Sequence, residues 1–221
     1  MTDKAFESEE LRVFHKACRE GKALEIANAK FISPDLLNTR SIVTGRTAVH
    51  EACANGHRDA LEQLLKRGAD THKTTFLGGD TPLHLAVISG NRSAVFLLLR
   101  HGCDPNVPNK YSATSFHYAG SKPTIAKLLL RYGGKVSLRD NSKKTPWDRV
   151  HEECPDNREL NKLMKEAFDR EEEERARTEL ARVKEEEDRA NAKRREANEA
   201  RERGKIEKTA SAYRQWRGGG G

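Results

Sequence analysis

Long apolar segments are missing from this chain of 221 residues. No stretch approaches the roughly 18 consecutive apolar residues that a membrane span requires, and residues 1–20 lack a basic region followed by an apolar one. We therefore expect a protein that is neither secreted nor embedded in a membrane. Its four cysteines are scattered and form no CxxC pair, which favours reduced thiols in a cytosolic or nuclear compartment over a disulfide framework.

Signatures of catalysis are missing as well. The sequence contains no GxSxG, GxxxxGKS/T, HExxH or GxGxxG motif, so the common nucleophile, phosphate, zinc and dinucleotide sites find no support. Paired carboxylates are frequent near the C-terminus, but an exposed helix offers no dry pocket in which they could act as acids or bases. We expect no enzymatic activity and no bound cofactor.

Charge is abundant but unevenly distributed. The chain is 34% charged with a formal net charge of +7. Residues 156–217 hold 18 basic and 17 acidic residues, so almost all of the excess lies before residue 156. Within the C-terminal part, residues 169–188 hold 5 basic and 10 acidic residues, whereas residues 189–217 hold 10 basic and 4 acidic ones. This part is therefore a charge dipole with a positive tip.

A repeat of about 34 residues runs through the chain. His15, His50, His84 and His117 follow one another at spacings of 35, 34 and 33 residues. Aligning the last three brings into register GRTAVHEACANGHRDALEQLLKRGAD, GDTPLHLAVISGNRSAVFLLLRHGCD and SATSFHYAGSKPTIAKLLLRYGGK. Each block reads as a turn, a short helix capped by threonine, a second turn, a Leu-rich helix and a glycine. One apolar face per helix pair requires stacking of neighbouring units.

The segment TPLHLA (residues 81–86) resembles the core motif of the ankyrin repeat, and GAD and GCD resemble its closing residues. The resemblance covers about residues 11–168, with a shortened first unit, three fuller repeats and a closing unit from Lys144. It implies an all-α ankyrin repeat solenoid of helix–turn–helix units that carry β-hairpin fingers on one side. We expect residues 1–10 to form an N-terminal extension.

The recurring histidines suggest a metal site at first sight. Successive repeats, however, place equivalent side chains about 8 to 10 Å apart, whereas metal ligands must lie about 2.0 to 2.3 Å from one ion. Local pairs such as His50 with Cys53 supply only two ligands. We therefore predict that the imidazoles bond backbone and hydroxyl groups in the turns, and we expect no metal site.

Departures from the repeat indicate where a partner binds. Two fingers are one residue longer than a 33-residue unit requires, and their tips are apolar. Basic residues surround them, which favours an acidic partner; a charged surface kept for solubility and apolar tips that fold back onto their own hairpins are the alternatives. The predicted fingertip contacts are Ile42, Val43, Arg46, His72, Lys73, Phe76, Leu77, Lys110, Tyr111 and Arg139. By resemblance, the groove contacts are Arg19, Glu20, Asn55, Ile88 and Ser89.

The fourth repeat departs most from the pattern. The turn between its helices has lost two residues, and Pro123 follows it, so we predict a short first helix there. Ser112 and Lys143 stand where turn glycines are expected, which suggests looser fingers at this end of the stack.

The C-terminal part predicts a charged rod. Residues 169–203 are rich in Glu, Arg, Lys and Ala, with four expected i,i+4 pairs that begin at Glu171, Glu173, Glu185 and Glu199. Such a helix spans about 52 Å. A solitary helix is favoured over a coiled coil with a partner and over disorder, because only Leu180 and Val183 are large and apolar before Ile206. Residues 204–221 form a basic aromatic tip with a glycine tail; the predicted tail contacts are Lys193, Arg194, Arg195, Tyr213 and Trp216.

These features favour a non-enzymatic adaptor or scaffold that binds one or more proteins. A cytoskeletal or axonemal assembly would suit the long charged helix, with a location in the cytoplasm, at the cytoskeleton or in a cilium. The alternative is an RNA-binding protein, in which residues 189–217 contact phosphates and the two aromatic residues of the tip stack on bases.

Overall fold

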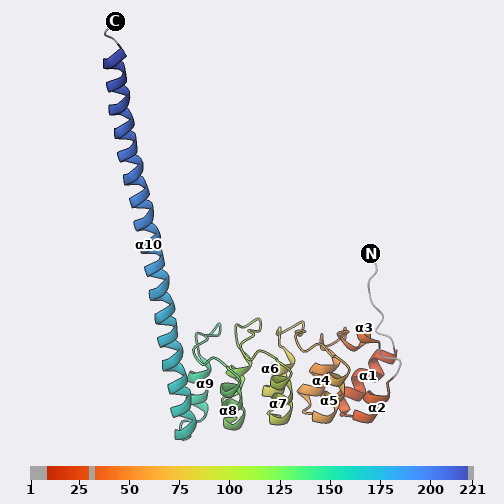
Figure 1. Cartoon of the computed structure of the whole chain (residues 1–221). Helices are drawn as coiled ribbons and strands as arrows, with labels where there is room; N and C mark the ends of the chain where they lie inside the picture. Colours follow the sequence, from red (N-terminus) through yellow and green to blue (C-terminus); the bar gives the residue numbers. More distant parts are fainter. Residues whose placement is uncertain (1–8, 30–32, 219–221) are drawn as a thin grey trace. The chain divides into compact units, whose positions relative to one another are not determined.

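The computed structural model describes residues 9–29 and 33–218, and for residues 34, 35 and 211–218 it describes the backbone alone. The chain divides into two compact units, Met1–Glu171 and Glu172–Gly221. All regular elements in the described part are helices (Figure 1). They are α1 (Glu9–Glu20), α2 (Ala23–Asn28), α3 (Pro34–Leu37), α4 (Ala48–Ala54), α5 (Arg58–Lys66), α6 (Pro82–Ile88), α7 (Arg92–Arg100), the 3₁₀ helix η1 (Ser115–Tyr118), α8 (Pro123–Arg131), α9 (Pro146–Glu153) and α10 (Arg158–Gly218).

The first unit is a single file of helix pairs, as the repeat predicted (Figure 1). The first helices of successive pairs contact one another in the order α1, α4, α6, η1 and α9, and the second helices do so in the order α2, α5, α7 and α8. One continuous core of Leu, Ala, Val and Ile side chains runs between the two layers. Each pair buries its apolar face against its neighbours, which is how a repeat stack is stabilised.

Three of the four repeat histidines hold consecutive repeats together, which confirms the predicted structural role for these three. The Nδ1 atom of His50, His84 or His117 accepts a hydrogen bond of 3.0–3.2 Å from the amide of the threonine three residues earlier. Nε2 then carries the proton and donates to a carbonyl oxygen of the next repeat: that of Asp80 at 3.1 Å, Ala113 at 3.0 Å or Lys144 at 3.2 Å. No group of three His, Cys, Asp or Glu side chains in the described residues could hold a metal ion.

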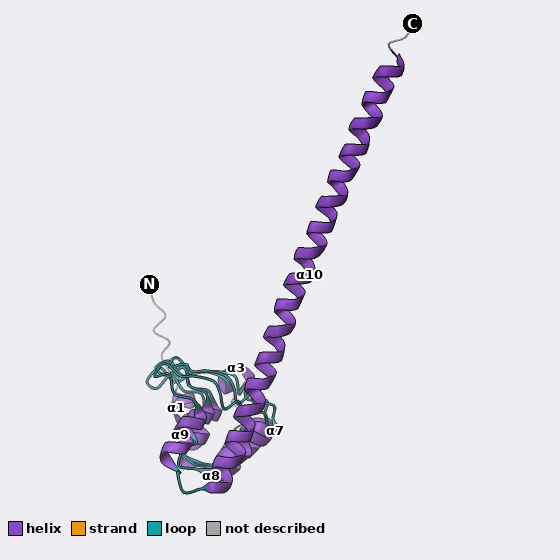
Figure 2. Cartoon of the chain, turned by 90° about the vertical axis from the view of Figure 1, so that its left-hand side faces the viewer, coloured by secondary structure: helices purple, strands orange, loops and turns teal. Residues whose placement is uncertain are grey.

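The loops between repeats form the expected fingers, which project from one side of the stack (Figure 2). They are finger 1 (residues 41–46), finger 2 (75–80), finger 3 (109–113) and finger 4 (140–144), each closed by a backbone hydrogen bond between its first and last residues. The resemblance implied β-hairpins, but no strand is assigned in the described residues. One or two backbone bonds per finger are too few for a ladder.

The fourth repeat has the short first helix that its sequence predicted, because η1 is a single 3₁₀ turn of four residues. Ser112 and Lys143 adopt left-handed backbone conformations, with φ of 56° and 63°. The predicted loosening of fingers 3 and 4 is nevertheless wrong. The side-chain oxygens of Asn109 and Asp140 each accept two backbone amides across their own finger, at 2.8–3.1 Å, and keep both fingers closed.

The beginning of α10 closes the stack. Leu160, Met164 and Ala167 are buried in the core, and the Phe168 ring lies 6.1 Å from that of Trp147. The carboxylate of Glu171 accepts hydrogen bonds from the backbone amides of Val136 at 2.9 Å and Ser137 at 3.0 Å. These contacts match the expectation that the apolar start of the C-terminal part seals the last repeat.

The second unit consists of the remainder of α10, which continues through Gly204 to Gly218. Three of the expected i,i+4 pairs form, between Glu173 and Arg177, Glu185 and Arg189, and Glu199 and Arg203. Nearly all of its described side chains are exposed, including Leu180, Val183 and Ile206. None of the helices in the described part of the chain is long and apolar enough to cross a bilayer.

The burial of the cysteines leads to a chemical prediction. Burial raises the pKa of the Cys18 thiol to about 12, with a further contribution from the nearby Glu51 carboxylate, and burial also raises the pKa values of Cys53 and Cys103. Because the thiolate is the reactive form, we expect iodoacetamide at neutral pH to alkylate the half-buried Cys154 first. Peptide mass spectrometry of the native and urea-unfolded protein measures this. Equal labelling of Cys53 and Cys154 in the native protein would contradict it.

Candidate functional site

The fingertips carry the most exposed apolar side chains of the stack's finger side. Val43 at the tip of finger 1 is 82% exposed, and Leu77 at the tip of finger 2 is 84% exposed. Ile42, Phe76 and Tyr111 are each about half exposed. We call these five residues the fingertip row. Exposed apolar side chains on neighbouring loops are the usual mark of a protein contact.

Phe76 does not fold back onto its own finger. A Cβ atom on Gly45 would lie 2.5 Å from the Phe76 ring, so the ring rests on the glycine of finger 1, whose φ is +66°. The guanidinium of Arg40 lies 5.2 Å from the centroid of the same ring. Phe76 thus joins fingers 1 and 2, which leaves Val43 and Leu77 as the free apolar ends of the row.

The predicted basic contacts differ in how they are engaged. Lys110 Nζ donates to the carbonyl oxygen of Phe76, Arg139 donates to that of Lys143 at 2.9 Å, and Arg46 lies 3.9 Å from Glu51. His72 is 3.5 Å from Asp70, and Lys73 is half-buried. Most of these side chains therefore help to hold the fingers together, in addition to giving the surface a positive charge.

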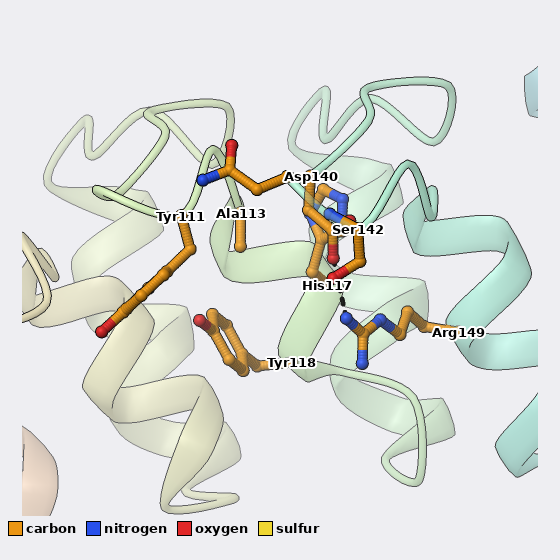
Figure 3. Close-up of a pocket in the computed structure, with 8 residues that line it drawn as sticks. Tyr111, Ala113, His117, Tyr118, Asp140, Ser142 and Arg149 are labelled. Carbon is orange, nitrogen blue, oxygen red and sulfur yellow. Dashed lines mark hydrogen bonds and ion pairs between the residues drawn. The ribbon is translucent and has the colours of Figure 1, made fainter.

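Between fingers 3 and 4 lies a cavity of about 240 Å³, lined by Tyr111, Tyr118, His117, Asp140 and Arg149 together with smaller residues (Figure 3). Burial of the Asp140 carboxyl opposes its ionisation, but the hydrogen bond from Arg149 at 2.7 Å and those from two backbone amides outweigh it and lower its pKa. Tyr111 and Tyr118 expose ring surface beside this ion pair. The cavity can accept a side chain that combines an apolar body with a polar end.

The predicted groove residues lie at the ends of the first helices. Arg19 binds the buried carboxylate of Glu51 at 3.3 Å, Asn55 donates to a carbonyl oxygen of its own helix, and the Ser89 hydroxyl donates to the carbonyl oxygen of Cys53 at 3.0 Å. Glu20 and Ile88 are exposed. Two of the five, Arg19 and Ser89, thus join neighbouring units, Asn55 bonds within its own unit, and Glu20 and Ile88 are accessible.

The structure describes the side chains of only some of the predicted tail contacts. Lys193, Arg194 and Arg195 are exposed on α10. The side chains of Tyr213 and Trp216 lie outside the described residues, although α10 continues through both positions.

Sequence reasoning missed the buried carboxylate of Glu51. It is 1% exposed and is held by Arg19, by Arg46 and by the Thr44 hydroxyl, so it connects α1, α4 and finger 1. The aligned repeats contained a signal for it. The residue after the repeat histidine is Glu51 in one repeat but Leu85 and Tyr118 in the next two, which indicates a partly buried position.

The comparison with known families agrees with this architecture. A family model described as "Ankyrin repeat" matches residues 44–76 and 78–110, the two units that contain α4 to α7. The protein contains ankyrin repeats. No curated protein matches the chain. The stacking of helices continues beyond the two matched repeats, through η1 and α8 to α9 and the start of α10. Ankyrin repeats are in general protein-interaction modules, which supports a role of the matched repeats in protein binding.

Proposed function

We propose that the protein is a non-enzymatic adaptor whose fingertip row, cavity and groove bind an acidic protein. The single observation that carries the proposal is the exposure of Val43 and Leu77 at adjacent fingertips among basic residues. Each apolar tip offers a contact that becomes favourable only when a partner covers it. Positive surroundings select a partner with carboxylates beside its own apolar side chains.

The charged helix supports a spacer role within the same proposal. Residues 172–218 span about 70 Å at 1.5 Å per residue, and the ion pairs along the helix help it to persist without burial. Of this length, residues 172–193 account for about 33 Å, and they would lie between the ankyrin repeats and a second contact near Lys193, Arg194 and Arg195. A large assembly such as a cytoskeletal or axonemal complex, in the cytoplasm or a cilium, suits a chain that carries two contacts.

A fingertip variant tests the proposal. We expect Val43→Ser with Leu77→Ser to reduce capture of partner proteins from the native source about tenfold or more, because two apolar anchors are lost. Both side chains are more than four-fifths exposed, so folding should be unaffected. Crosslinking followed by quantitative mass spectrometry measures the captured proteins and the crosslinked positions.

The matched control replaces two leucines elsewhere that are 80% and 70% exposed, Leu24→Ser with Leu180→Ser. It should capture the same proteins as the unaltered chain. Equal losses with both double variants would mean that these proteins are retained by non-specific adsorption to exposed apolar side chains and not by the fingers. Capture that depends on RNA and on residues 189–217 but not on the fingers would instead favour the RNA-binding alternative.

A further inference from the structure

The third and fourth repeats are almost without acidic residues. Residues 81–139 contain eight Lys and Arg but a single acidic residue, Asp104. Protein surfaces ordinarily mix both signs of charge. Part of this excess lies not on the fingers but on the second helices, α7 and α8, which form a different layer of the stack from α6 (Figure 1).

Six residues on these two helices or just after the second form what we call the outer cationic face. Arg92, Phe96 and Arg100 follow one another at four-residue spacing on α7 and therefore share one side of the helix. Arg131 is the last residue of α8, Tyr132 is its C-cap residue, and Lys135 follows. The rings of Phe96 and Tyr132 meet edge to face at 6.4 Å, which joins the contributions of the two helices.

The cations of this face have no acidic partner among the described residues. Within the part of the chain that the structure describes, Arg92, Arg100, Arg131 and Lys135 form no ion pair, whereas neighbouring Lys127 binds Glu159 at 2.7 Å and Lys66 binds Glu62 at 3.1 Å. Arg100 and Arg131 stand at helix C-termini, where a cation is favoured by the helix dipole. Arg92 begins α7, where the helix dipole disfavours a cation. Stabilisation of the helices therefore does not explain why all four positions carry a cation.

We propose that the outer cationic face binds an acidic protein segment that carries an apolar side chain among its carboxylates. Guanidinium groups bind carboxylates through paired hydrogen bonds. Arg92 and Arg100 are about 12 Å apart along α7, which corresponds to about four residues of an extended chain. Phe96, 39% exposed between them, offers the apolar contact.

The aromatic geometry favours a protein over a nucleic acid. Base stacking needs an open ring face. The Arg100 guanidinium lies 5.7 Å from the centroid of the Phe96 ring and so covers one face, while Tyr132 packs against the ring at nearly a right angle. This second binding surface is separate from the fingertip row, so the chain can hold two protein partners through its repeats alone.

A charge-reversal variant of the full chain tests the assignment. The probe is a fluorescein-labelled peptide that repeats Glu-Asp-Phe-Glu, and fluorescence anisotropy measures its binding at low salt. We expect Arg92→Glu with Arg100→Glu and Arg131→Glu to weaken binding about tenfold or more, since three charge-assisted contacts are lost together. Phe96→Ala should weaken it less, and a peptide with Ser in place of Phe should no longer distinguish Phe96→Ala from the unaltered protein.

The matched control is Lys165→Glu with Arg170→Glu and Lys184→Glu, which changes the net charge by the same amount at exposed positions of α10. This control should bind the peptide like the unaltered protein, with all variants folded by circular dichroism. If both triple variants weakened peptide binding equally, net charge alone would explain the effect and the assignment would be overturned. Undetectable binding to the unaltered chain, or tighter binding of a single-stranded RNA oligomer at this face, would overturn it as well.

Discussion

Replacing Met164 with alanine is expected to lower the free energy of unfolding of the ankyrin stack by about 2 to 5 kcal/mol. Met164 is fully buried where the start of α10 covers the last repeat. Its truncation removes apolar contacts and leaves a cavity that the surrounding helices can only partly fill. Urea unfolding followed by circular dichroism gives the change, provided that the signal of the stack is separated from that of the exposed remainder of α10.

The neighbouring Leu163 provides the control. It is 38% exposed, so Leu163→Ala is expected to cost about 1 kcal/mol or less. Similar losses for both variants would show that α10 does not close the core as described. A large loss for Met164→Ala would also explain why a repeat stack needs a terminal cover, because the last apolar face has no following repeat to bury it.

Acidification is expected to destabilise the stack between pH 6.5 and about 4. Burial lowers the pKa of His50 from 6.5 to about 4, and burial also lowers the pKa values of His84 and His117. In this window the unfolded chain binds protons that the folded chain does not. The contribution of the buried histidines to the free energy of unfolding is therefore fully present above pH 6.5 and is lost as the pH falls. His50 alone contributes a loss of about 3 kcal/mol.

Urea unfolding across this range measures the loss, and its slope against pH gives the number of protons taken up on unfolding. We expect that number to exceed one, because three imidazoles contribute. The lowered pKa values of Glu62 and Asp140 act in the same direction but only below about pH 5, so the slope above that pH reports the imidazoles. Stability that stays constant or rises on acidification to pH 4 would contradict buried neutral imidazoles.

The order of the helices could be predicted from sequence because the repeat supplies it several times over. The TPLHLA motif, the threonine caps and the glycine at each helix end all indicate the same boundaries, and stacking follows from the apolar faces. The short first helix of the fourth repeat could be predicted for the same reason, since a missing pair of residues stands out against the intact units.

Contacts that occur only once between neighbouring repeats could not be predicted, because no periodic signal specifies them. Phe76 could be identified as a fingertip residue, but its position on Gly45 depends on how two fingers lean together. The aligned repeats indicate that position 51 is partly buried, but they do not identify the arginine 32 positions earlier as the partner of Glu51. Fingers 3 and 4 lack the expected turn glycines. Their closed conformation depends on hydrogen bonds from backbone amides to the side chains of Asn109 and Asp140.

The histidine bridges also bear on how such a chain can evolve. Each imidazole takes its amide partner from its own unit and its carbonyl partner from the unit that follows. Duplication or loss of one complete unit therefore leaves every remaining bridge with both partners, whereas a deletion within a helix would misalign them. Insertions in the fingers are tolerated, as the extra residues near Val43 and Leu77 illustrate, so new specificity can arise there while the scaffold keeps its length in whole units.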